Sequence, residues 1–136
     1  MTYVTLRGGT TLIGYRYEEG SFSLPYLRFV EAMRGYALDR DSETLRKELG
    51  SWAGEVARIV SEVRERLEVD PRFSQDHDDD RYRLLHAVSS FLRSGSMVQP
   101  LLIMLEDLHD ADGGTLDMLT HVARNLGGSR LLVVGT

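Results

Sequence analysis

Two adjacent carboxylates, Glu106 and Asp107, are the residues of this sequence whose types and spacing best suit chemistry. Carboxylate oxygens are ligands that Mg²⁺ prefers, and a carboxylate can also act as a general base toward a water molecule. The pair directly follows an unbroken apolar run, Leu101–Leu105, and so lies where a structural element ends. One acid could therefore act on a metal ion while its neighbour acts on an attacking water.

The apolar run before the acids predicts a β-strand that is buried on both faces, as in a parallel sheet covered by helices. In open α/β sheets, ligands collect outside the carboxyl ends of the strands, which is where Glu106 and Asp107 fall. A strand that ends in paired acids is the Walker B arrangement of P-loop NTPases. On this interpretation Glu106 holds Mg²⁺ through water, and Asp107 is the catalytic residue that polarises the attacking water. The alternative is an ordinary buried strand with solvated acids at its end.

The residues around the acids form a more specific pattern than the acids alone. Residues 105–112 read Leu-Glu-Asp-Leu-His-Asp-Ala-Asp, which resembles the "L-[DE]-D-L-H-W-A-D" segment of an AAA-type, STAND-like ATPase family. That module occurs in LuxR-type transcriptional regulators and in multidomain adenylate cyclases and kinases. Asp110 stands where the family usually has Trp. The resemblance implies ATP and Mg²⁺ as cofactors of the intact domain. His109 could position either acid, or could equally be a capping or packing residue.

Three further segments, residues 12–18, 23–34 and 54–67, are similar to the same family. In the family a phosphate loop precedes the first of them, but the motif G-x-x-x-x-G-K-[ST] does not occur in this sequence. We therefore expect the chain to begin just after that loop and to stop inside a strand. The missing phosphate-loop half of the domain would be its partner. The chain alone should bind neither nucleotide nor Mg²⁺ tightly and should not hydrolyse ATP.

The residue patterns predict an α/β fold with parallel strands at 11–17, 101–106 and 130–135. The resemblance implies a partial P-loop NTPase (ASCE/AAA-like) three-layer fold. These strands would be numbers 2, 3 and 4 of that sheet, with flanking helices and the acid-bearing strand in the middle. Residues 1–136 would form a single partial domain, and residues 24–93 a mostly helical insertion between strands. The last strand would have an open edge, through which the chain could self-associate.

Helical periodicity predicts four helices in the insertion. The first opens near Leu24 and carries an aromatic stripe, and the second, from Glu43, ends at Gly50. A third is expected over Ala53–Leu67, with Glu55 on its solvated face, and a fourth over Arg81–Arg93. Ser94-Gly95-Ser96 is expected to stop the fourth helix. The acidic patch at 76–80 is interpreted as a solvated loop whose acids favour the N-terminus of that helix, with a metal site as the alternative.

The amino-acid composition argues against several other classes of function and of binding partner. The net charge is −5 and no basic stripe is present, so direct contact with nucleic acid is not expected. The sequence has no Cys, which excludes disulfides and thiolate zinc sites. It has neither an apolar run that could span a bilayer nor a start that resembles a signal peptide, so we expect no membrane partner and a cytoplasmic location.

Two functions therefore remain open. The first is part of an ATP-driven signalling or transcription-regulator module that carries Walker B without Walker A. The second is a catalytically inactive, P-loop-less module that binds other proteins. A G-x-x-x-x-G-K-[ST] motif encoded just upstream would distinguish the first from the second.

Overall fold

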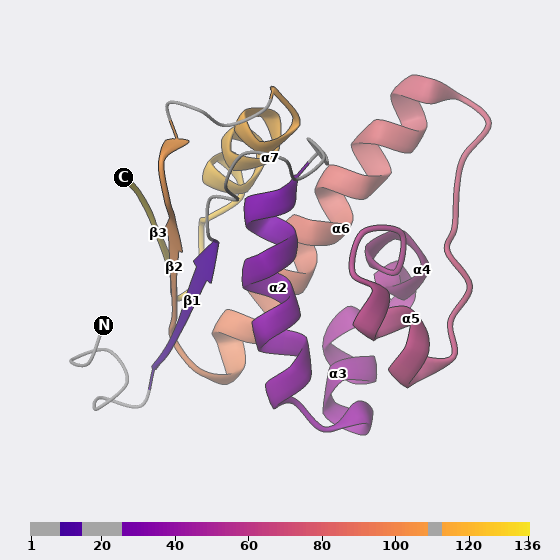
Figure 1. Ribbon diagram of the computed structural model, residues 1–136, viewed down its shortest axis with the longest axis horizontal. Helices are drawn as coiled ribbons and strands as arrows, with labels where there is room; N and C mark the ends of the chain where they lie inside the picture. Colours follow the sequence, from indigo (N-terminus) through magenta and orange to yellow (C-terminus); the bar gives the residue numbers. More distant parts are fainter. Residues whose placement is uncertain (1–8, 15–25, 109–112) are drawn as a thin grey trace, which may run out of the picture.

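The structure is a computed structural model, and it describes residues 9–14, 26–108 and 113–136 of the chain. These residues form a mixed α/β arrangement, with a small parallel sheet beside a layer of helices (Figure 1). The helices are α2 (Leu27–Asp39), α3 (Ser42–Leu49), the short 3₁₀ helix η1 (Gly50–Trp52), α4 (Ala53–Val56), α5 (Ser61–Leu67), α6 (His77–Val98) and α7 (Gly113–Arg124).

The sheet has three strands in the described residues, β1 (Thr10–Gly14), β2 (Leu101–Leu105) and β3 (Leu131–Gly135). Their order is β1-β2-β3 and both neighbouring pairs are parallel. The prediction of three parallel strands with the apolar run at the centre is confirmed. Because the pairs are in parallel register, the carboxyl ends of all three strands lie at one edge of the sheet, where Gly14, Leu105 and Gly135 are aligned.

In Figure 1 the sheet is seen nearly edge-on, and the labelled helices lie to one side of it. Leu12, Ile103 and Leu105 share one face of the sheet and are buried, whereas Leu132, on the opposite face, is 59% exposed. The central strand itself is buried on both faces, as predicted, since Leu102 on that opposite face is only 8% exposed. Within the described residues, however, the helices lie on one side of the sheet (Figure 1). An unbroken apolar run indicates that a strand is central, but it does not indicate which layers cover it.

The helical layer is built around the apolar stripe of α2. Phe29, Met33 and Ala37 have no exposed surface, as their helical spacing predicts. Tyr36 extends this stripe and packs edge-to-face against Phe91 of α6, with the ring centroids 5.4 Å apart. The aromatic stripe of this helix is thus part of the core.

One predicted helix end, at Gly50, is confirmed by backbone geometry, and one predicted helix start is wrong, because α6 begins at His77 and not at Arg81. Gly50 follows α3 with a left-handed φ of 54°, a conformation that glycine adopts without steric cost. Asp76 caps α6, because its side chain accepts hydrogen bonds from the backbone N–H groups of Asp78 (2.9 Å) and Asp79 (3.1 Å). The acidic patch is therefore a helix start.

The predicted single helix over Ala53–Leu67 is wrong, because the chain leaves the helix between α4 and α5. The N–H of Ile59 donates to the carbonyl of Val56, which is the tightened pattern of a helix end. Val60 then takes an extended conformation (φ −116°, ψ 96°) and is fully buried. Glu55, in α4 before this break, lies in the interior and is 1% exposed. The sequence pattern had placed Glu55 on a solvated face.

The segment Ser94-Gly95-Ser96 was expected to end the last helix before β2, but α6 continues through it to Val98. Packing against α2 explains why this segment of α6 has small residues. A Cβ added at Gly95 would lie 2.7 Å from the hydroxyl oxygen of Tyr36. Ser96 is fully buried and donates its hydroxyl to the carbonyl of Arg93 within the same helix. These residues let α2 approach α6 closely and do not break the helix.

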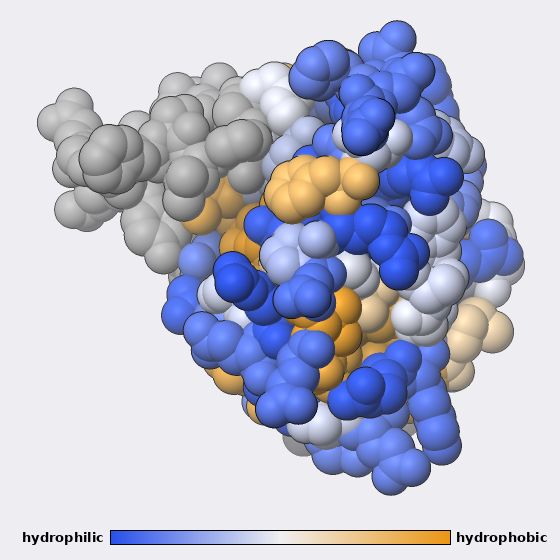
Figure 2. All heavy atoms as spheres, turned by 90° about the vertical axis from the view of Figure 1, so that its right-hand side faces the viewer, coloured by the Kyte–Doolittle hydropathy of each residue, from blue (hydrophilic) through white to orange (hydrophobic). Residues whose placement is uncertain are grey.

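Figure 2 shows a face of the helical layer that is mostly hydrophilic, with hydrophobic side chains gathered near its middle. Ion pairs join the helices across their surface. Arg34 of α2 pairs with Glu62 of α5 at 2.6 Å, and Arg58 pairs with Asp80 of α6 at 2.9 Å. No helix within the described ranges combines the length and apolarity needed to cross a membrane.

Gly95→Ala should lower the free energy of unfolding by about 1–3 kcal/mol, because the added methyl group would overlap the hydroxyl of Tyr36. Gly35→Ala is the matched control, since a Cβ there meets nothing within 4 Å. It should stabilise α2 by about 0.5–1 kcal/mol through helix propensity. Chemical denaturation of both variants measures the two effects, and equal values would show that the contact between Gly95 and Tyr36 does not matter.

Candidate functional site

The two predicted site residues, Glu106 and Asp107, directly follow β2 and lie between the carboxyl ends of β1 and β3. The N–H of Glu106 donates to the carbonyl of Gly14 at the end of β1, at 3.0 Å. On the other side, the N–H of Leu108 donates to the carbonyl of Thr136, just after β3, at 2.9 Å. The backbone of the acids is therefore hydrogen-bonded to both neighbouring strands, at the edge where ligands of open α/β sheets collect.

Arg28, in the first turn of α2, holds this turn from the helical side. Its Nε donates to the carbonyl of Glu106 at 2.5 Å, and its Nη2 donates to the carbonyl of Asp107 at 2.8 Å. The side chain is buried, with 6% of the residue exposed. A guanidinium group suits this role because its donors form a rigid planar fork that can serve two acceptors at once. Arg28 therefore fixes the two peptide groups that carry the acids.

Sequence reasoning did not identify Arg28 as part of the site. It stands between Leu27 and Phe29 at the start of an apolar helix stripe, and a single arginine in that position is the one available signal. Its partners are main-chain carbonyls, which exist at every residue. The pairing of Arg28 with the turn therefore becomes visible only when β2 and α2 are placed together.

Two glycines allow this close packing at the strand ends. A Cβ added at Gly14 would lie 2.2 Å from the carbonyl oxygen of Arg28, so any side chain there would push α2 away. A Cβ at Gly135 would lie 2.1 Å from Cδ1 of Leu108. Gly14 is therefore required, because the clash there is with the backbone of α2, whereas at Gly135 the clash is with the end of the flexible Leu108 side chain, which can move.

Asp107 has a left-handed backbone with φ 50°, which is uncommon outside glycine. Asp and Asn tolerate this region better than other side chains do. The N–H of Asp107 faces the hydroxyl of Thr136 at 3.4 Å. Unusual backbone conformations of this kind cluster at functional sites, where the surrounding contacts hold them in place.

Both acids are half-buried at the sheet edge. Mg²⁺ usually keeps several waters and is bound by one or two carboxylates together with substrate phosphates. The Glu106–Asp107 pair fits that donor set, with Glu106 as the residue that would hold the ion through water. No group of three or more potential ligands lies together in the described part of the chain. His109, Asp110 and Asp112 lie outside the described residues.

The AAA ATPase domain family matches residues 4–134, nearly the whole chain. The chain therefore belongs to the AAA ATPase domain family, as the residues around Glu106 suggested. Comparison with curated proteins finds no match, and comparison with solved structures finds none either. The family assignment establishes an AAA-type ATPase module, and the mixed α/β arrangement with its parallel sheet is compatible with a part of that fold.

Arg28→Ala should destabilise the chain by about 2–3 kcal/mol, because two buried carbonyls lose a charged donor. Arg28→Lys should recover part of this loss, since an ammonium group is a point charge without the planar fork. Arg34→Ala is the control on the same helix, where an exposed ion pair contributes at most about 1 kcal/mol.

Urea denaturation measures these values, and amide hydrogen exchange at Leu108 reports directly on the turn. Exchange at Leu108 should accelerate in Arg28→Ala and stay unchanged in Arg34→Ala. Equal stabilities of the two alanine variants would contradict the role given to Arg28.

Proposed function

We propose that this chain is the Walker B part of an ATP-dependent module in signal transduction or transcription regulation, of the kind found in LuxR-type regulators and multidomain adenylate cyclases. The observation that supports it best is the position of Glu106 and Asp107, which follow the central strand at the edge where the ends of β1 and β3 converge. The family match supports the ATPase class, and the resemblance of residues 105–112 supports the signalling context.

In this proposal Glu106 would hold Mg²⁺ through water, and Asp107 would orient and polarise the water that attacks the γ-phosphate. Bound Mg²⁺ neutralises charge that develops on the phosphates. The chain's own contribution is positional. Arg28 and the two strand ends hold the peptide groups of both acids, so the backbone that carries the carboxylates does not need to be ordered at the moment of reaction.

The groups that bind the nucleotide phosphates must come from outside this sequence, because it contains no G-x-x-x-x-G-K-[ST] motif. The proposed partner is the phosphate-loop half of the domain. A location in the cytoplasm, where ATP is available, belongs to the same proposal, as does the absence of direct contact with nucleic acid.

A second candidate function is a protein-binding module without nucleotide turnover. The position of β3 at the edge of the described sheet, with Leu132 59% exposed, favours it. Its partner would be a second copy of the chain, paired through this strand edge. Sequencing the gene upstream separates the two candidates, because the ATPase proposal requires a phosphate loop and the binding module does not.

Calorimetry of this chain with Mg-ATP should show no binding at micromolar affinity. Most of the phosphate affinity in this fold comes from phosphate-loop amides and one Lys, and the sequence has no such motif. The control is the same titration with a protein that carries this chain together with a phosphate loop, which should bind. A clear micromolar isotherm for the chain alone would contradict the proposed division of the site.

In a protein that joins this chain to a phosphate loop, Asp107→Asn should leave nucleotide binding largely intact and lower hydrolysis at least tenfold, since a general base typically contributes about 10²–10⁴-fold. Asn also tolerates the left-handed backbone at this position. Glu106→Gln should weaken Mg²⁺-dependent binding as well, because its charge acts near the metal.

Rates at saturating Mg-ATP separate binding from turnover, and Glu43→Gln, an exposed acid on α3, should behave as wild type. If Asp107→Asn hydrolyses ATP at the normal rate and Glu106→Gln does not, the roles assigned to the two acids are exchanged. Normal behaviour of both variants would reduce the acids to a solvated strand end.

A further inference from the structure

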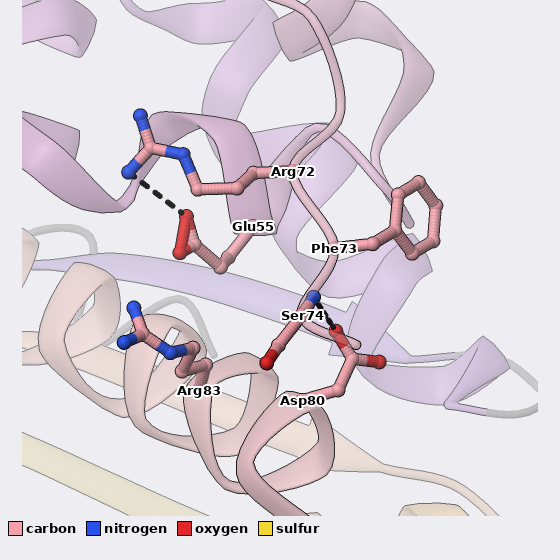
Figure 3. Close-up of a pocket in the computed structure, with 6 residues that line it drawn as sticks. All are labelled: Glu55, Arg72, Phe73, Ser74, Asp80 and Arg83. Atoms are coloured by element: carbon pink, nitrogen blue, oxygen red, sulfur yellow. Dashed lines mark hydrogen bonds and ion pairs between the residues drawn. The ribbon is translucent and has the colours of Figure 1, made fainter. Parts of the chain in front are cut away.

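A cavity of about 210 Å³ lies where α4, the start of α6 and the segment between α5 and α6 meet (Figure 3). Glu55 comes from α4, while Asp80 and Arg83 come from the first turns of α6. The cavity is lined by Glu55, Arg72, Phe73, Ser74, Asp80 and Arg83. It is separate from the turn that carries Glu106 and Asp107, and the proposed ATPase function does not use it.

Glu55 is the unusual member of this cavity. The residue is 1% exposed, and neither of its carboxylate oxygens has a hydrogen-bond partner among the described residues. The nearest cation is Arg72, whose Nη1 lies 3.8 Å from Oε1, which is an ion pair but too long for a hydrogen bond. A buried carboxylate without donors is costly. The cavity therefore presents an acceptor whose donors the fold does not supply.

Two guanidinium groups flank this carboxylate. Figure 3 shows the Glu55 side chain between Arg72 on one side and Arg83 on the other. Arg83 is held in place by a hydrogen bond from its Nε to Asp79, at 2.8 Å. Among the described residues, no hydrogen bond engages the Nη atoms of Arg83. Those atoms can therefore receive an anionic group that enters beside Glu55.

The remaining charged group of the cavity, Asp80, already has its partners within the fold. Asp80 accepts hydrogen bonds from the N–H of Ser74 (2.7 Å) and from Arg58 (3.0 Å), and its second oxygen lies 2.9 Å from Arg58. Asp80 thus acts within the fold, as an anchor between the connecting segment and α6. The groups left for a ligand are one carboxylate and two guanidinium groups.

We propose that this cavity binds a small α-amino acid in its zwitterionic form. The ammonium group would donate to Glu55, and the carboxylate would accept from Arg72 and Arg83. A simple cation would be repelled by both guanidinium groups, and a simple anion would leave Glu55 without a donor. The volume of about 210 Å³ is below the roughly 300–1,000 Å³ of sites for drug-sized ligands. It therefore suits molecules of the size of glycine to threonine.

Calorimetry of the chain with glycine, L-alanine, L-serine and L-threonine tests the proposal. At least one should bind with a dissociation constant below about 1 mM, a value consistent with a ligand of few heavy atoms. The N-acetyl derivative of the best ligand lacks the ammonium group, and its amide derivative lacks the carboxylate. Each derivative should bind at least tenfold more weakly.

The proposal is overturned if none of the four binds below about 10 mM, in which case the cavity holds only water. It is also overturned if either derivative binds as well as the parent amino acid, because one end of the site would then do nothing.

Substitutions assign each end of the ligand. Glu55→Gln should weaken amino-acid binding at least tenfold, whereas Glu65→Gln, an exposed acid on α5, should leave it unchanged. Arg83→Gln should weaken binding of the amino acid at least fivefold and leave binding of its amide derivative unchanged. Arg64→Gln, an exposed arginine on α5, is the control for that variant.

Arg83 is largely exposed, with 45% of its side chain accessible, so Arg83→Gln keeps the proposal testable if Glu55→Gln does not fold. Unchanged amino-acid binding in Arg83→Gln would overturn the assignment.

Discussion

The guanidinium group of Arg28 joins the first helix to the turn that carries the two acids, and the geometry of the sheet edge depends on this contact. The group is charged and buried, and its acceptors are two peptide carbonyls. A buried charge that lost these acceptors would be costly, so α2 and the turn after β2 must keep their relative positions in the folded chain. Gly14 makes the contact possible, because a side chain there would overlap the backbone of Arg28.

The same helix carries a second polar anchor toward the other helices. Tyr36 donates its hydroxyl to Glu48 of α3 at 2.6 Å, and its ring packs against Phe91 of α6. Burial, and then the hydrogen bond to Glu48, raise the pKa of Tyr36 well above its ordinary value, so the hydroxyl remains a donor across the physiological pH range. Through Arg28 and Tyr36, α2 couples the position of the helical layer to the position of the acids.

Features that depend on a local pattern could be predicted from the sequence, whereas features that depend on a distant partner could not. The strand Leu101–Leu105 and the acids after it follow from an unbroken apolar run and a change of residue type. Gly95 reads locally as a helix stop, and its packing role depends on Tyr36, which is distant in sequence. Glu55 fits the charged face of a continuous helix, but in the fold it is 1% exposed and lies beside Arg72 of the segment that follows α5. Arg28 donates to main-chain carbonyls, and because every residue has one, the residue types do not reveal this contact.

The two sites differ in what holds their charged groups. At the sheet edge, the contacts that position Glu106 and Asp107 are made to their main-chain atoms, by the carbonyl of Gly14 and by the side chain of Arg28. Exchange of an acid for its amide there leaves these contacts in place and changes mainly the charge presented to a ligand. In the cavity beside α4, the buried side chain of Glu55 is itself the group that lacks donors. A ligand that supplies them would therefore add stability as well as occupancy, because binding to the folded state alone shifts the folding equilibrium. Chemistry at the sheet edge can thus be changed with little effect on the fold, whereas occupancy of the cavity is coupled to folding.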